Sequence, residues 1–216
     1  PIGKAFRGAF NDTQAQEMAG HAIAEAVKRS KVSNEEIDDV IIGAAGQQGS
    51  QQGNIARQSL LRAGLPVSVA GMSLDRQCAS GMMAIATAAK EITEDGMTIT
   101  VGGGVESVSL VRNENFRMDR ARDPWLEENI PSLYMTMIET AENVAVDYGV
   151  NRRDQDVFAQ QSQKRFAVAD QAGVFAEEIL PVSIEKRHGG MLIIERDEHP
   201  RPDTSLAKLA KLPGVN

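Results

Sequence analysis

The chain has 216 residues and a formal net charge of −7, with 42% hydrophobic and 25% charged side chains. This composition is typical of a globular protein of one or two domains, and its acidic balance argues against nucleic acid or anionic membranes as partners, because both require basic surfaces. No apolar run approaches the roughly 20 residues of a membrane span, and the single cysteine excludes an internal disulfide, so we expect a soluble cytoplasmic protein.

Helix and strand patterns alternate along the first half of the chain. Asn11, Asp12 and Thr13 offer N-caps for a helix whose small and apolar residues recur at helical spacing over residues 15–27. Strands are expected at residues 40–42, 67–74 and 97–101. Helices are expected at residues 54–63 and 79–92, and the second of them is apolar almost all round, which predicts burial on most sides. This order of short elements indicates a layered α/β domain.

The character of the sequence changes near Leu110, where residues 111–131 are charged and irregular. A helix is expected at residues 139–148, and a longer one starts after its cap Asn151 and ends at Gly173. Residues 178–195 are typical of two short strands around a His-Gly-Gly turn, and the last stretch starts another helix. The second half is therefore expected to be mainly helical.

Cys78 lies where the second strand pattern gives way to a helix. A lone cysteine is more often a small buried hydrophobe than a nucleophile. At a helix start, however, unpaired backbone N–H groups and the helix dipole stabilise a thiolate, and the small residues Ala79, Ser80 and Gly81 leave room for an acyl group. The residues alone leave both readings open.

Four segments resemble the thiolase family, which comprises acetyl-CoA acetyltransferases and 3-ketoacyl-CoA thiolases. "DRQCASGMMAI", "GGGVESVS" and "ETAENVA" occur in the family's order and at about its spacing, and "RRDQDVFAQQSQKRFAVADQAGVFAEEILPV" resembles its loop domain. The resemblance implies an α/β thiolase-like fold, whose two halves form layers α/β/α/β/α, with an inserted loop domain. Residues 1–110 would be the N-terminal α/β half without its first strand, and residues 111–216 the loop domain over coenzyme A, incomplete at its C-terminal end.

The resemblance implies that Cys78 is the catalytic nucleophile, which carries the acyl group as a thioester. An acyl transfer of this kind needs donors for the thioester oxygen, and the backbone N–H of Cys78 is one candidate. Relatives continue well past residue 216, and their second half supplies a histidine base, an asparagine that holds water and a second cysteine. We give His21, His188 and His199 no catalytic role, and we interpret Glu106 of the GGGVES segment as a hydrogen-bonding strut.

Two further residues are candidates for substrate binding. Arg201 corresponds to a residue against the nucleotide end of coenzyme A, and an ordinary solvated surface arginine is an equal alternative. Met137 is a candidate wall of the acyl pocket, with a core methionine as the alternative. Lys208 stands where relatives often have a serine that touches the coenzyme, so this sequence departs from the family there.

The sequence therefore predicts an acyl-CoA acyltransferase that cleaves 3-ketoacyl-CoA with coenzyme A, or condenses two acyl-CoA molecules, through an acyl-cysteine. This chain alone would be catalytically incomplete. Coenzyme A is expected as a substrate, no cofactor is expected to be tightly bound, no metal site is assigned, and the protein is expected to form a homodimer or homotetramer. The alternatives are a ketosynthase-type condensing enzyme of the same fold and a non-catalytic domain that binds coenzyme A or associates with other subunits.

Overall fold

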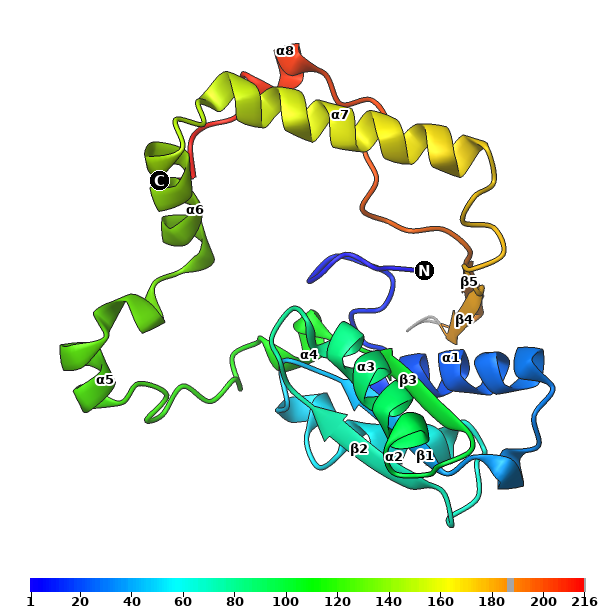
Figure 1. The fold of residues 1–216 in the computed structure, drawn as a ribbon. Coiled ribbons are helices and arrows are strands. Elements are labelled where there is room, and N and C mark those ends of the chain that lie inside the picture. Colours follow the sequence, from blue (N-terminus) through cyan, green and yellow to red (C-terminus); the bar gives the residue numbers. More distant parts are fainter. Residues whose placement is uncertain (186–188, 216) are drawn as a thin grey trace. The chain divides into compact units, whose positions relative to one another are not determined.

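The computed structural model describes residues 1–185 and 189–215 (Figure 1). The chain divides into two compact units: the first comprises Pro1–Arg117 and Leu180–Glu198, and the second comprises Met118–Ile179 and His199–Asn216. The domain boundary at residue 110 and the role of a coenzyme A cover were inferred from the resemblance, and both stay predictions.

The first unit contains a parallel three-stranded sheet in the order β2-β1-β3. Its strands are β1 (Asp39–Gly43), β2 (Ala70–Leu74) and β3 (Thr100–Gly104). All five residues of the central strand β1 are buried, as expected of a parallel strand that is covered on both faces. The three strands expected from the sequence are confirmed, although β2 and β3 each start three residues later than expected, because Val67 and Met97 belong to the preceding loops.

Helices cover both faces of this sheet (Figure 1). On one face, Val40 and Ile42 join one apolar cluster with residues of α1 (Ala15–Ser30) and α2 (Ile55–Arg62). On the other face, Ile41 packs against Ala84 and Ala88 of α3 (Ser80–Thr93). The alternation of the β1 side chains therefore builds three layers, helix on sheet on helix.

The start of α1 differs from the expectation. Its N-cap is Gln14, which makes no side-chain capping bond, whereas Asn11 to Thr13 were expected to cap it. Asn11 instead accepts hydrogen bonds from Gly8 N and Ser109 Oγ, so loop contacts have taken its side chain away from the helix. The expected apolar stripe is present in part, with Ala15, Ala19, Ile23 and Val27 buried.

The helix predicted at residues 79–92 is α3, and the prediction that it is buried on most sides is wrong for the described chain. One side of α3 packs on the sheet, but Met82 is 77% exposed and Ile85 57% exposed on the other. The composition of α3 is apolar, as the sequence shows, but burial also requires neighbouring residues. The described residues pack against one side of α3 only.

Shorter elements complete the first unit. They are η1 (Asn34–Glu36), η2 (Gly49–Gln51), α4 (Val108–Val111) and an antiparallel pair formed by β4 (Val182–Glu185) and β5 (Met191–Ile194). Glu198, which follows β5, contacts the N-terminal segment: its Oε2 accepts from Lys4 N and Ala9 N, each at 3.0 Å. The two short strands expected in residues 178–195 are confirmed.

The second unit is helical. It consists of α5 (Pro124–Asn129), η3 (Pro131–Tyr134), α6 (Met137–Asp147), α7 (Arg152–Gln171) and α8 (Leu206–Leu209). The cap at Asn151 and the stop at Gly173, which has a φ of +74°, are confirmed. The segment that looked irregular contains α5, where Asp123 caps the helix and Pro124 starts it, a recognisable helix-start pattern.

Candidate active site

Cys78 lies in the tight turn between β2 and α3, at the carboxyl end of the parallel sheet. The connections that follow β1 and β2 lead to helices on opposite faces, so this edge is a topological switch point, where α/β proteins bind their ligands. Cys78 is exposed and is followed by Ala79, the N-cap residue of α3. The structure therefore places the sulfur at a helix start and leaves it accessible in this chain.

Ser80 closes the turn that contains Cys78. Its hydroxyl accepts a hydrogen bond from Arg76 N at 2.8 Å and donates one to Gln77 O at 2.6 Å. Asp75 Oδ1 accepts from Gln77 N at 2.7 Å, and Gln77 has a left-handed φ of 51°. These bonds hold a backbone conformation that side-chain-bearing residues seldom adopt, so the turn is tightly defined.

The backbone amides of the turn are mostly occupied. The N–H of Ala79 bonds Arg76 O at 3.1 Å, and the N–H of Ser80 bonds Gln77 O at 3.0 Å. With Arg76 N and Gln77 N also engaged, four neighbours of the Cys78 N–H serve the turn itself and are not free for a ligand oxygen. The Cys78 N–H as an oxyanion donor stays a prediction.

Glycines let the start of α3 lie directly on the strand ends. A Cβ at Gly43, the last residue of β1, would lie 2.2 Å from the carbonyl carbon of Ser80. A Cβ at Gly104, the last residue of β3, would lie 3.1 Å from the Cα of Gly81. Real Cβ atoms do not approach backbone to within 3.0 Å, so glycine is required at position 43, and the contact at position 104 would be tighter than nine in ten real ones.

A hydrogen-bonded bridge joins the two loops that flank the cysteine turn. Glu106 Oε2 accepts from Ala45 N at 2.8 Å, and its Oε1 accepts from Gln51 Nε2 at 2.8 Å. Gln51 is fully buried and also accepts from Ser107 N. These contacts confirm Glu106 as a hydrogen-bonding strut. They also show a structural role for Gln51, which the sequence did not predict because several glutamines in the same loop look alike.

The recorded contacts of the described histidines are with residues other than Cys78. His21 is on α1, exposed, with Nε2 2.9 Å from Pro181 O in the β4 segment, which is a structural contact. His199 is exposed in the second unit. His188 lies outside the described residues. Among the described residues, the structure adds nothing that favours a histidine base for Cys78.

The remaining predicted site residues belong to the second unit. Met137 starts α6 and is largely exposed, which excludes its alternative as a core methionine within this chain. The Arg201 backbone N–H bonds Gln163 Oε1 at 2.7 Å, and its guanidinium bonds His199 O at 3.3 Å. Lys208 forms an ion pair with Asp203, so its charge is partly compensated.

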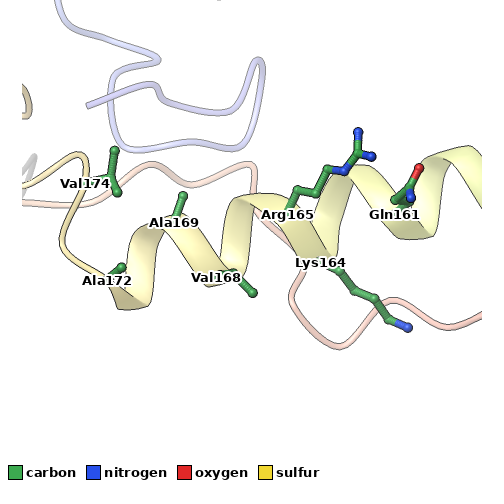
Figure 2. A pocket seen from close by; sticks show the side chains of 7 residues that line it. All are labelled: Gln161, Lys164, Arg165, Val168, Ala169, Ala172 and Val174. Atoms are coloured by element: carbon green, nitrogen blue, oxygen red, sulfur yellow. The ribbon is translucent and has the colours of Figure 1, made fainter.

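A shallow hollow of about 460 Å³ lies along the C-terminal half of α7 (Figure 2). Its lining residues are Gln161, Lys164, Arg165, Val168, Ala169, Ala172 and Val174. Figure 2 shows Lys164 and Arg165 pointing to different sides of the helix, so their charges do not converge on one point of the hollow. None of the predicted site residues lines it.

Two buried carboxyls lie at the end of the first unit opposite to Cys78. Asp39 starts β1 and Glu91 is near the end of α3, and both are more than nine-tenths buried. Burial raises the pKa of Glu91, and the negative charges of Asp39 and Asp95 raise it further. Burial also raises the pKa of Asp39, against a hydrogen bond from Val40 N that lowers it. Glu91 Oε2 has no hydrogen-bond partner among the described residues.

The described part of the chain has neither a candidate metal site nor a helix that could span a membrane. Residues 1–185 and 189–215 contain no cluster of three or more His, Cys, Asp and Glu side chains that could hold a metal ion. Within the same residues, the apolar stretches of the helices are too short or too charged for a bilayer crossing.

Comparison with known proteins gives one consistent picture. The model of the thiolase N-terminal domain matches residues 1–215. The beta-ketoadipyl-CoA thiolase of Pseudomonas aeruginosa is 42% identical over 231 residues, which cover 100% of this chain and 57% of that protein. An acetyl-CoA acetyltransferase of Chromobacterium violaceum is 37% identical over 217 residues, which cover 96% of this chain and 55% of that protein.

A solved structure shows the same fold. The crystal structure of the Bacillus anthracis acetyl-CoA acetyltransferase matches with a TM-score of 0.84 and 35% identity, over 98% of this chain and 55% of that one. This likeness confirms the layered α/β fold class expected from the sequence. The chain spans about 57% of the length of the curated relatives that it matches.

Proposed function

The chain belongs to the thiolase family, and from that premise we propose that the protein carrying it transfers acyl groups to and from coenzyme A through a thioester on Cys78. The observation that carries this proposal is the position of Cys78. It is exposed, lies at the start of α3, and sits in a turn held by Ser80 at the carboxyl ends of the parallel strands.

The reaction divides into two steps that share the cysteine. In thiolysis, the Cys78 sulfur attacks the 3-keto carbonyl carbon of a 3-ketoacyl-CoA, and the bond between C2 and C3 breaks. The shortened acyl group stays on the sulfur, while the departing acyl-CoA carbanion takes a proton. The thiol of a second coenzyme A then attacks the acyl-cysteine, receives the acyl group and returns Cys78 to its starting form. The reverse sequence condenses two acyl-CoA molecules.

The chain's own residues contribute the nucleophile and its support. The N–H groups at a helix start favour negative charge, which suits both a thiolate and the oxygen of a tetrahedral intermediate. The family resemblance assigns the general base, the water-holding asparagine and the second cysteine to the part of thiolases beyond the matched half. The activity is therefore proposed for the whole protein, of which this chain would be the nucleophile-bearing part.

The second unit is the proposed cover of the coenzyme A site. The guanidinium of Arg201, exposed and held by His199 O, is suited to the nucleotide end of coenzyme A. Met137, exposed at the start of α6, is the proposed wall of the acyl pocket. Coenzyme A is a substrate in this proposal, and no tightly bound cofactor takes part.

The exposed apolar side of α3 supports a larger assembly. Met82 and Ile85 present side chains of a kind that soluble proteins cover by further layers or subunits. A homodimer or homotetramer of the whole protein is proposed, and its mass in solution tests this.

The decisive activity test compares substrates on the whole protein. We expect coenzyme A-dependent cleavage of a 3-ketoacyl-CoA, reduced at least a thousandfold by Cys78→Ala and unchanged by Lys90→Ala on the exposed part of α3. A decarboxylating, ketosynthase-type enzyme would instead consume a malonyl thioester and cleave no 3-ketoacyl-CoA. A coenzyme A-binding domain without activity would do neither, and either result would refute the proposal.

A further inference from the structure

We propose that Ser80 is a positioning residue that aims the backbone N–H of Cys78 at the oxygen of the reacting thioester. This inference rests on the proposed acyl transfer through Cys78 and assigns Ser80 a role in that transfer beyond holding the turn. Its starting point is the way in which one buried hydroxyl spans the turn.

Ser80 is 4% exposed. Its hydroxyl makes two hydrogen bonds to backbone groups that precede Cys78 in the chain, one as acceptor and one as donor. It accepts from Arg76 N and donates to Gln77 O, which uses both its donor and an acceptor site. The backbone N–H of Ser80 bonds the same Gln77 oxygen at 3.0 Å. Two donors from one residue therefore hold a single carbonyl group.

That carbonyl belongs to the peptide unit that joins Gln77 to Cys78. A peptide unit is planar and trans, so its C=O and N–H point in opposite directions. Fixing the Gln77 oxygen therefore fixes the direction of the Cys78 N–H. Ser80 controls this direction even though it lies two residues after the cysteine.

The anchor itself is rigid. A Cβ at Gly43 would lie 2.2 Å from the carbonyl carbon of Ser80 and 2.6 Å from Gly81 N, so the Ser80 backbone rests against the end of β1. The left-handed φ of Gln77 is a strained conformation for a residue with a side chain. We therefore expect the peptide unit to relax to another orientation when the Ser80 bonds are lost. Ser80 transmits the position of the sheet to the turn.

The chemistry that this N–H would serve is the acylation step. The Cys78 sulfur attacks the carbonyl carbon of an acyl-CoA, and the carbonyl electron pair moves onto its oxygen, where a donor stabilises the negative charge. When the pair returns, the bond from carbon to the coenzyme A sulfur breaks, and coenzyme A leaves as a thiolate that takes a proton. Alkylation of the same sulfur by iodoacetamide displaces iodide and builds no charge on a carbonyl oxygen.

The test compares these two reactions on the whole protein. Single-turnover acylation by an acyl-CoA and alkylation of Cys78 by iodoacetamide are measured for the parent and for Ser80→Ala. We expect acylation to fall at least tenfold and alkylation to change less than threefold, because only acylation uses an oxyanion donor. A purely structural role would move both rates together or neither.

Matched variants complete the design. Ser59→Ala removes a fully buried hydroxyl that has no hydrogen-bond partner among the described residues, and we expect it to leave both rates unchanged. Ser80→Thr and Ser80→Val differ only by a hydroxyl in place of a methyl group, so they give the same comparison if Ser80→Ala does not fold. Thr should acylate at least ten times faster than Val.

The outcomes separate the inference from the function on which it rests. If the parent is acylated on Cys78 and Ser80→Ala is acylated equally fast, the role of Ser80 is refuted and the proposed function stands. If the parent takes no acyl group on Cys78, the proposed function fails, and the inference fails with it. Equal loss of acylation and alkylation in Ser80→Ala would also overturn the inference.

Discussion

Replacing Gly43 by alanine tests how the sheet supports the cysteine turn. The added Cβ would lie 2.2 Å from the carbonyl carbon of Ser80 and 2.3 Å from its oxygen, and both atoms are backbone. Ordinary van der Waals contact begins at 3.4 Å, so the end of β1 and the start of α3 must part by about 1.2 Å. Neither element has a side-chain rotamer that can absorb this movement.

The cost has two measurable parts. Overpacking of this size destabilises proteins by about 1 to 3 kcal/mol. A displacement near 1 Å at a reacting group lowers rates by about a hundredfold, since the sulfur moves with the start of α3. We therefore expect Gly43→Ala to lower both the free energy of unfolding in urea and the rate of Cys78 acylation in the whole protein.

The control is Gly103→Ala on the adjacent strand β3. A Cβ there meets only the terminal carbon of Ile42 at 3.8 Å, which is an ordinary contact, so this variant should behave like the parent. If Gly43→Ala unfolds and acylates like Gly103→Ala, the strand end does not position the turn, and the reasoning is wrong.

Two further predictions concern charge. Glu91→Gln should raise the free energy of unfolding at pH 8 by about 1 kcal/mol, because it removes a buried carboxylate that the charge of Asp39 repels and whose Oε2 has no hydrogen-bond partner among the described residues. Since the pKa of Glu91 is raised in the folded protein, its ionisation costs stability as the pH rises above the pKa of an ordinary glutamate carboxyl. The thermal midpoints of parent and variant should therefore converge as the pH falls to about 4, and a constant difference would contradict this. Arg201→Ala should raise KM for coenzyme A several-fold and leave kcat nearly unchanged, as loss of a ground-state contact does. An unaltered KM would show that Arg201 is an ordinary surface arginine.

The sequence predicted the strands of the first unit because their apolar runs are short and continuous. A run such as Val40 to Ile42 is typical of a strand that is covered on both faces, and β1 is buried throughout. The caps of the long helix were also local: Asn151 and Gly173 determine its ends through their own side chain or conformation. Local signals of this kind need no knowledge of the tertiary fold.

Other features depend on partners that sequence cannot show. Asn11 looked like a helix cap but bonds Gly8 and Ser109, since a distant loop competes for its side chain. The apolar composition of α3 predicted burial, whereas burial requires a neighbouring layer on each side. At the candidate site, the role of Glu106 as a hydrogen-bonding strut was predicted correctly. The contacts of Ser80 were not, because only the structure shows its hydroxyl bonded to both Arg76 N and Gln77 O.

The most direct test of the account is the mass of the peptide that contains Cys78. The whole protein is incubated with an acyl-CoA in the absence of acceptor, quenched in acid and digested. We predict a single acyl group on Cys78, which is released by added coenzyme A and is absent from Cys78→Ala. An unmodified Cys78 in protein that still cleaves 3-ketoacyl-CoA, or an acyl group carried by another residue, would contradict the account.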